Sequence, residues 1–185
     1  MKKIIFYFIV IFFLLTFCYP GKTFAREISS ASSAVLANRI VSKAYDKRIE
    51  VLGKFLKQYN SPLAQFAAKF VKDADRYNID WRLVAAIAGV ESTFGNFTPN
   101  NSYNAWGWGI YGENVTRFSS WEEGIGVISK GIREEYMNKW NAGNVDEIGR
   151  IYAASPDWSY RVEWYMERIR DFELNNAKDS LSISI

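Results

Sequence analysis

The sequence predicts a mainly helical α+β domain with one small β-hairpin. Two observations support this fold class. After residue 33, most of the chain repeats its apolar residues at the three- and four-residue spacings of amphipathic helices. One stretch, Ala105–Phe118, instead alternates glycines with aromatic and β-branched residues, which is typical of a small irregular hairpin. Of the 185 residues, 49% are apolar, which is enough for one compact core.

Residues 1–25 have the pattern of an export signal. Two lysines precede an apolar run over residues 4–19, and Thr23-Phe24-Ala25 supplies an acceptable cleavage site. The run is short for a membrane span, which needs about 20 residues. Cleavage is therefore favoured, and an N-terminal anchor through residues 4–19 is the alternative. Either way the domain is expected outside the cytoplasm, at the cell surface or secreted.

Composition excludes several classes of function. Residues 1–25 contain Lys2, Lys3, Lys22 and no acid, so the formal charge of +3 belongs to the signal and no nucleic-acid partner is expected. The only cysteine, Cys18, leaves with the signal, and the chain has no histidine. Ser-His-Asp and Cys-His catalysis and most zinc sites are thereby excluded. We expect hydrolytic chemistry to use carboxylates, Tyr, Ser or Lys, with no metal and no cofactor.

Residues 26–60 are expected to form a linker and an amphipathic helix. Arg26–Ser33 is small and polar, as in a flexible linker. Ala34–Tyr59 carries apolar residues at helical spacing and charged residues on much of its other face. We interpret it as a stalk or an N-terminal helix packed on the domain. A helix that assembles with partners is the alternative.

The domain itself is expected over residues 61–175, before a tail at 176–185. Ser61 can cap a helix that begins at Pro62 and runs to Tyr77. A turn at Asn78-Ile79-Asp80 precedes a central helix. The later helices, the first capped by Ser119 or Ser120, are expected over Trp121–Trp140, Asn144–Tyr152 and Ser159–Asn175.

The central helix is almost wholly apolar but carries one carboxylate near its end. A cap at Asp80 and a stop at Gly95 place Glu91 in its last turn. Apolar surroundings and the partial negative charge of a helix C-terminus both disfavour ionisation, so the pKa of Glu91 is expected to be raised. A carboxyl group that keeps its proton near neutral pH can act as a general acid. The alternative is a glutamate that reaches solvent or binds a backbone N–H.

Four motifs, in order, resemble those of the lysozyme-like glycosidases of bacterial cell walls. Glu91–Gly95 (ESTFG) resembles their apolar helix that ends in Glu-Ser, followed by an aromatic residue and glycine. Asn104–Gly112 (NAWGWGIYG) resembles the Asn-Leu-Phe-Gly-Ile-Lys-Gly segment of the autolysin and flagellar N-acetylglucosaminidases, glycoside hydrolase family 73. It is less similar to the Gly-Leu-Met-Gln segment of goose-type lysozymes and soluble lytic transglycosylases. Phe118–Gly124 resembles the start of the family's next helix, and Tyr152–Trp158 (YAASPDW) resembles its Tyr-Ala-Thr-Asp-Pro-x-Tyr motif.

The resemblance covers Pro62–Phe172 and implies a lysozyme-like helical domain with a β-hairpin at the lip of the active site. It further implies an endo-β-N-acetylglucosaminidase or muramidase-like enzyme that cleaves glycan strands of peptidoglycan or a related N-acetylaminosugar polymer. Glu91 would be its general acid. The chain departs from the family between the hairpin glycines and the next helix, where the interval Glu113–Arg117 is shorter than in family members, which often carry a second acid there.

Two routes for the reaction stay open from the sequence. Glycosidases normally use two carboxyl groups, and Glu113 is either the second one, across the cleft, or a solvated hairpin residue. Alternatively, the substrate's own N-acetyl group attacks the anomeric carbon, or its C6 hydroxyl closes an anhydro ring, as in lytic transglycosylases. Tyr152 suits this second route because its phenol can hydrogen-bond the acetamido group. Its alternative is a tyrosine of the core.

Aromatic residues around the hairpin are candidates for sugar binding, because their rings offer flat apolar faces. Trp106 and Trp108 alternate with glycines, so one is expected to face the core and the other the ligand. Asn104 either bonds the Glu91 region or an acetamido group, or it stabilises a turn. A catalytically silent aminosugar-binding domain on the same fold is the other interpretation. The predicted substrate-binding residues are Asn104, Trp106, Trp108, Tyr111 and Trp158.

Overall fold

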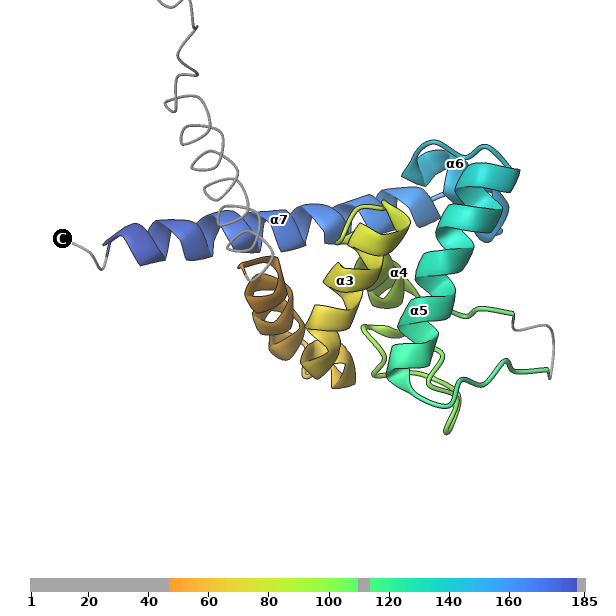
Figure 1. Ribbon diagram of the computed structural model, residues 1–185, viewed down its shortest axis with the longest axis horizontal. Coiled ribbons are helices and arrows are strands. Elements are labelled where there is room, and N and C mark those ends of the chain that lie inside the picture. The colour runs from red at the N-terminus through yellow and green to blue at the C-terminus, as the bar shows by residue number, and fades with distance from the viewer. Residues whose placement is uncertain (1–46, 110–113, 183–185) are drawn as a thin grey trace, which may run out of the picture. The chain divides into compact units, whose positions relative to one another are not determined.

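The computed structural model describes residues 47–109 and 114–182, with side chains described as far as residue 176 (Figure 1). The described residues belong to one compact unit, Lys43–Ile185. The predicted signal or anchor, the linker, and the candidate residues Tyr111 and Glu113 lie outside the described residues. Within the described part of the chain, no helix is both long enough and apolar enough to cross a membrane.

The described residues are mainly helical, which confirms the helical part of the predicted class. A helix over 47–58 comes first. The 3-10 helix η1 and the π-helix η2 are short segments that extend α3 at its start and α5 at its end. The remaining order is η1 (Pro62–Phe66), α3 (Ala67–Tyr77), α4 (Leu83–Ser92), α5 (Trp121–Gly131), η2 (Ile132–Lys139), α6 (Val145–Tyr152) and α7 (Trp158–Ser182).

The predicted hairpin over Ala105–Phe118 is described only in part. Residues 105–109 form turns, and Asn114 is a single bridge residue, so the described residues contain no strand. The loop that joins α4 to α5 extends to one side of the helices (Figure 1). Its two arms are joined by the backbone N–H of Phe118, which donates to the carbonyl oxygen of Ser102 at 2.8 Å.

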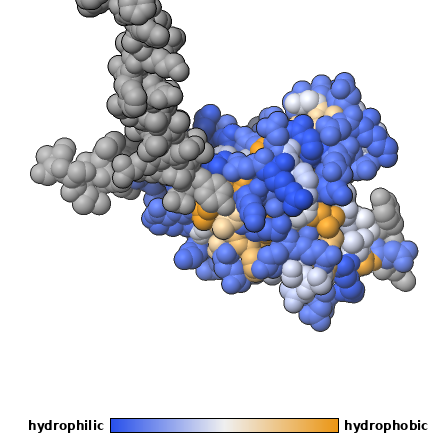
Figure 2. Space-filling model, viewed as in Figure 1, coloured by the Kyte–Doolittle hydropathy of each residue, from blue (hydrophilic) through white to orange (hydrophobic). Residues whose placement is uncertain are grey.

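The core is built around α4. Its residues from Leu83 to Gly89 are all buried, and α4 packs against α7 while α3 packs against α5. The helix over 47–58 contributes Leu52, Phe55 and Leu56 to the same core. The core therefore begins before the boundary at residue 61 that the sequence suggests. Figure 2 shows a mostly hydrophilic surface on the face of Figure 1, with apolar residues in small patches.

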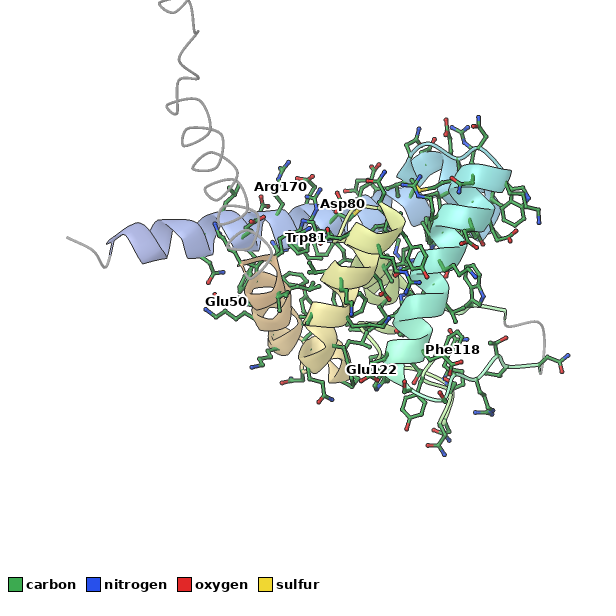
Figure 3. All side chains as sticks on the ribbon, viewed as in Figure 1. Glu50, Asp80, Trp81, Phe118, Glu122 and Arg170 are labelled. Carbon is green, nitrogen blue, oxygen red and sulfur yellow. The ribbon has the colours of Figure 1, made fainter. Side chains whose placement is uncertain are left out.

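Both ends of α4 differ from the sequence prediction. The helix starts at Leu83, and its N-cap is Arg82, which makes no side-chain capping bond. Asp80 (Figure 3) lies in the turn before the helix, where its side chain accepts the backbone N–H of Arg82 at 2.9 Å. The helix ends at Ser92, and the left-handed residue that stops it is Thr93 rather than Gly95, because Thr93 and Phe94 already have positive φ values of 50° and 58°. This conformation is costly for both residues. Full burial of the Phe94 ring beneath the helix offsets that cost.

Candidate functional site

Glu91 lies in the last turn of α4, at the surface end of a buried helix, as predicted. The residue as a whole is exposed, but its Oε1 accepts a hydrogen bond of 2.6 Å from the indole Nε1 of Trp158. Trp158 is only 3% exposed, at the start of α7. Oε2 adjoins Gly107, where an added Cβ would lie 3.5 Å from it. One oxygen is therefore fixed by a buried donor, and the other borders the loop between α4 and α5.

Although the residue as a whole is exposed, its carboxyl group is partly buried, and this burial raises the pKa of Glu91 above its ordinary value, in the predicted direction. The hydrogen bond from Trp158 and the charge of Arg161 act in the opposite direction, and burial prevails. Arg161 reaches this end of α4, since its guanidinium lies 3.4 Å from the carbonyl oxygen of Val90. Glu91 is therefore a carboxyl group that holds its proton more firmly than a solvated glutamate, next to donors that stabilise its anion.

Tyr152, the last residue of α6, links Glu91 to the loop. Its ring stacks on Trp158, with centroids 4.8 Å apart and planes at 23°. Its hydroxyl donates to the carbonyl oxygen of Trp106 at 2.5 Å. Burial, and then the neighbouring charge of Glu91, raise the pKa of Tyr152 well above its ordinary value. The phenol therefore stays neutral, with its proton committed to the loop and its oxygen available only as an acceptor.

A pocket of about 410 Å³ lies between the loop, η2 and the end of α6; Glu91 does not line it, but two of its neighbours, Gly107 and Tyr152, do. This volume falls in the usual range for small-molecule sites, about 300–1,000 Å³. Its wall is aromatic: the Tyr136 ring lies 5.9 Å from that of Trp108 and 5.0 Å from that of Trp140. Gly107 belongs both to this wall and to the surroundings of Glu91. The lining residues are Gly107, Trp108, Gly109, Glu135, Tyr136, Trp140, Ile151 and Tyr152.

Trp106 and Asn104 do not touch this pocket, which corrects their assignment as substrate-binding residues. Trp106 is completely buried, and its indole N–H donates to the carbonyl oxygen of Val84 at 2.9 Å. The side chain of Asn104 is buried as well. Its Oδ1 accepts the N–H of Trp108, and its Nδ2 donates to the carbonyl oxygens of Trp108 and Thr116. Both residues hold the loop in shape. Trp108 faces the pocket, so the alternation with glycine did separate an inward from an outward tryptophan.

Trp158 also has a different position from the one expected. Its ring is buried between Tyr152 and Gly149, where an added Cβ would lie 3.0 Å from the indole. No face of the ring is left for a sugar. Its contribution to the site is the N–H that fixes Glu91, so Trp158 is a positioning residue.

Several residues of the site were not predicted from the sequence. Tyr136 and Trp140 were assigned to an ordinary helix, although their four-residue spacing places them on one face. They lie on or just after η2, and π-helices are often found at functional sites. Glu135 is the one carboxylate among the described lining residues, and it pairs with Lys139 at 2.8 Å. Ser92 ties the end of α4 to the loop by donating to the carbonyl oxygen of Ala105 at 2.8 Å.

Two glycines of α5 allow the loop to lie directly on this helix. A Cβ at Gly124 would lie 2.8 Å from the ring of Trp106, and one at Gly131 would lie 2.5 Å from the ring of Trp108. Real Cβ atoms do not approach a rigid ring so closely without displacing it. Because Gly131 has no side chain, the ring of Trp108 can pack against α5, and this contact determines its position in the pocket wall.

Within the described residues, no group of three or more His, Cys, Asp or Glu side chains is placed to hold a metal ion. No family model matches the chain, and no curated protein matches it in sequence. The chemistry of the site is therefore inferred from its geometry.

Proposed function

We propose that this protein is an exported enzyme that cleaves the glycan strands of peptidoglycan or a related N-acetylaminosugar polymer. In this proposal the domain has a lysozyme-like fold, and Glu91 is the general acid. The single observation that carries it is the carboxyl group of Glu91, whose pKa is raised, which Trp158 fixes, and whose neighbours Gly107 and Tyr152 line an aromatic pocket.

The surroundings of Glu91 favour its protonated form before the proton is transferred and stabilise its carboxylate afterwards. Burial favours the protonated form before the reaction, so that the proton is available for the glycosidic oxygen. After transfer, the carboxylate is stabilised by the 2.6 Å hydrogen bond from Trp158 and by the charge of Arg161. A general acid of this kind contributes about 10²–10⁴-fold to the rate.

The pocket wall suits amino sugars. Trp108, Tyr136 and Trp140 offer ring surfaces on which the apolar face of a pyranose can stack. The carboxylate of Glu135 can accept hydrogen bonds from sugar hydroxyls. Since the proton of Tyr152 is directed to Trp106, its oxygen is free to accept the N–H of an acetamido group.

The partner of Glu91 in the reaction is a separate question. Among described residues, Glu135 is the carboxylate that lines the pocket, whereas Glu113 lies outside them. Either would serve as the second group of a two-carboxylate hydrolase. A lytic transglycosylase, in which the C6 hydroxyl of the substrate attacks, needs only Glu91 and an acceptor such as Tyr152.

A sugar-binding domain without catalysis is the second candidate. It is favoured by the pairing of Glu135 with Lys139, because this ion pair occupies an oxygen of the only carboxylate among the described lining residues. On this alternative, the aromatic pocket would bind glycan strands and Glu91 would only accept hydrogen bonds from them.

Digestion of purified peptidoglycan separates these candidates. We expect the wild-type protein to release reducing ends or anhydro-sugar ends, which mass spectrometry of the fragments distinguishes. Glu91→Gln keeps an acceptor for Trp158 but carries no acidic proton, so its activity should fall by about 10²-fold or more. Glu134→Gln is the matched control. Glu134 is an exposed residue of η2 that does not line the pocket, so this variant should retain activity. Equal digestion by the Glu91 variant and wild type would refute the assignment.

A further inference from the structure

The chain itself places an ammonium group against two lining residues of the aromatic pocket. The Nζ atom of Lys139 lies 2.8 Å from a carboxylate oxygen of Glu135 and 5.6 Å from the ring centroid of Trp140. Glu135 and Trp140 both line the pocket, whereas Lys139 does not. A primary ammonium is therefore already held within reach of a carboxylate and an aromatic ring, the two kinds of group that recognise such a cation in proteins.

The ion pair between Lys139 and Glu135 can be exchanged for a pair with a ligand. The two residues stand four positions apart on η2, and their side chains are 63% and 45% exposed. Exposed pairs of this kind contribute little to stability. The long lysine side chain can therefore move into solvent when another ammonium takes its place, and Glu135 then still has a cationic partner.

The rest of the pocket suits a cationic sugar. The ring of Tyr152 lies 6.3 Å from that of Trp108 and 5.6 Å from that of Tyr136, so these three lining rings form a continuous wall for the apolar face of a pyranose. The described lining residues include one carboxylate, that of Glu135, and no lysine or arginine. The charge of the pocket therefore favours a cation over a neutral or acidic group.

We infer that this pocket prefers a hexosamine unit with a free amine, whose ammonium displaces that of Lys139 from Glu135 and lies against the ring of Trp140. This inference rests on the proposed function for the identity of the polymer and adds that strand units without their N-acetyl group bind best here. An N-acetylated unit can stack on the same rings, but it offers the carboxylate only an uncharged N–H. Lys139 acts as the internal competitor of the ligand.

Binding of two tetrasaccharides tests the preference. The full-length Glu91→Gln protein, which should not cut them, is titrated with the tetramer of glucosamine or of N-acetylglucosamine at about pH 6, where amines are protonated. The indole N–H signals of Trp108 and Trp140 are followed by NMR. We expect the free-amine tetramer to shift both signals and to bind about 5-fold more tightly than the acetylated one. Equal binding of the two tetramers, or binding of neither, would overturn the inference.

Two variants that each remove one charge should have opposite effects in the same assay. Added to Glu91→Gln, Glu135→Gln should abolish the preference, whereas Lys139→Gln should raise the affinity for the free-amine tetramer about 3-fold, because the competing ammonium is gone. The matched controls are Glu134→Gln and Lys130→Gln, which change the net charge equally at an exposed pair that does not line the pocket. Equal effects of the controls would mean that net charge alone sets the preference, and the inference would fail.

A third ligand distinguishes an amine on a sugar from an amine on a peptide. Nα-acetyl-lysine amide carries the same ammonium but no pyranose to stack on the rings, so it should bind about 10-fold more weakly than the glucosamine tetramer. Equal or tighter binding of the lysine derivative would overturn the assignment to a sugar.

These binding measurements also separate the inference from the proposed function. If the wild type does not digest peptidoglycan, but the preference is seen and Glu135→Gln abolishes it, the proposed function fails and the amine-binding pocket stands. If the wild type digests peptidoglycan but both tetramers bind alike, the inference fails and the proposed function stands.

Discussion

At Glu91, burial and neighbouring groups have opposite effects on one carboxyl group. Burial favours the neutral form, while the indole N–H of Trp158 and the charge of Arg161 favour the anion. Burial has the larger effect. Such a balance keeps the pKa raised without making ionisation prohibitive, which is what a residue that gives up and regains a proton requires.

The raised pKa of Glu91 has a consequence for stability. The ordinary pKa near 4.5 applies to the unfolded chain, and the folded value lies above it. Folding therefore favours the protonated form, so this residue's contribution to stability is greatest below pH 4.5 and is lost as the pH rises through the folded pKa. Glu91→Gln cannot ionise and keeps an oxygen for Trp158. We expect equal melting temperatures at about pH 4 and a higher one for the variant at about pH 7, measured by thermal unfolding.

Glu134→Gln is the control for this comparison. Glu134 is exposed and lies 3.6 Å from Lys130, a surface pair that contributes little. Its substitution should leave the pH profile of stability unchanged. A wild-type protein more stable than Glu91→Gln at neutral pH would mean that folding favours the Glu91 anion, and that the pKa of this carboxyl group is lowered rather than raised.

Two buried serines on neighbouring helices should respond in opposite ways to substitution. The hydroxyl of Ser129 in α5 is buried and, among the described side chains, has no hydrogen-bond partner. That of Ser92 donates to Ala105 and accepts the N–H of Gly95 at 2.9 Å. Ser129→Ala removes an unsatisfied group and should stabilise the protein by about 1 kcal/mol, whereas Ser92→Ala should cost about 1–3 kcal/mol. Urea unfolding measures both, and a destabilised Ser129→Ala would contradict the assignment of an orphan hydroxyl.

Among the elements, α5 shows how glycines without side chains determine the shape of the pocket wall. A Cβ at Gly131 would meet the rigid ring of Trp108 at 2.5 Å, whereas one at Gly126 would meet the end of the Lys69 side chain at 3.3 Å and the Asp73 carboxylate at 3.5 Å. Both substitutions by alanine improve helix propensity by about 1 kcal/mol. Gly131→Ala should nevertheless be destabilised relative to Gly126→Ala by about 1–3 kcal/mol and should lose ligand binding, because Trp108 must move.

Denaturant unfolding and intrinsic tryptophan fluorescence of the two variants measure this difference. Gly126→Ala should match the wild type in fluorescence and be equally or more stable. If both alanine variants are equally stable and keep the same spectrum, then Trp108 is not held against α5, and the pocket wall must have a different shape.

A helix boundary can be predicted from the sequence when it depends only on a few adjacent residues. Ser61, Ser120 and Asn144 were expected at helix starts and do cap there, because capping depends on a few adjacent residues. The end of α4 was placed two residues too late, since burial of Phe94 in the core favours a left-handed turn that local propensity would reject. The π-helix that carries Tyr136 was missed because its apolar spacing is that of an α-helix.

At the scale of the whole molecule, the site combines distant parts of the chain. Glu91 and Trp158 are 67 residues apart in sequence, and Trp106 and Tyr152 are 46 apart. The sequence pointed to Glu91 and Tyr152 because each stands in a local motif, but the bond between Trp158 and Glu91 depends on α7 packing along α4. For that reason Trp158 was interpreted as a sugar platform, although its N–H is what the site uses.

The helix over 47–58 belongs to this packing. The ring of Phe55 lies 5.7 Å from that of Phe94, just after Glu91, and 5.8 Å from that of Phe172 on α7. Leu52 and Leu56 are fully buried beside it. Each large apolar side chain removed from a core costs about 2–5 kcal/mol, and a domain has about 5–15 kcal/mol in total. A chain without this helix would therefore lose most or all of its stability.

Two deletions test this dependence. Removing residues 1–42 leaves the compact unit entire and should preserve cooperative thermal unfolding, followed by circular dichroism. Removing residues 1–58 should abolish the transition or lower its midpoint far below that of the shorter deletion. If the helix were only a stalk, the two products would melt at the same temperature. Their difference therefore decides whether the geometry of α4 and α7, and with it the bond between Trp158 and Glu91, depends on the N-terminal helix.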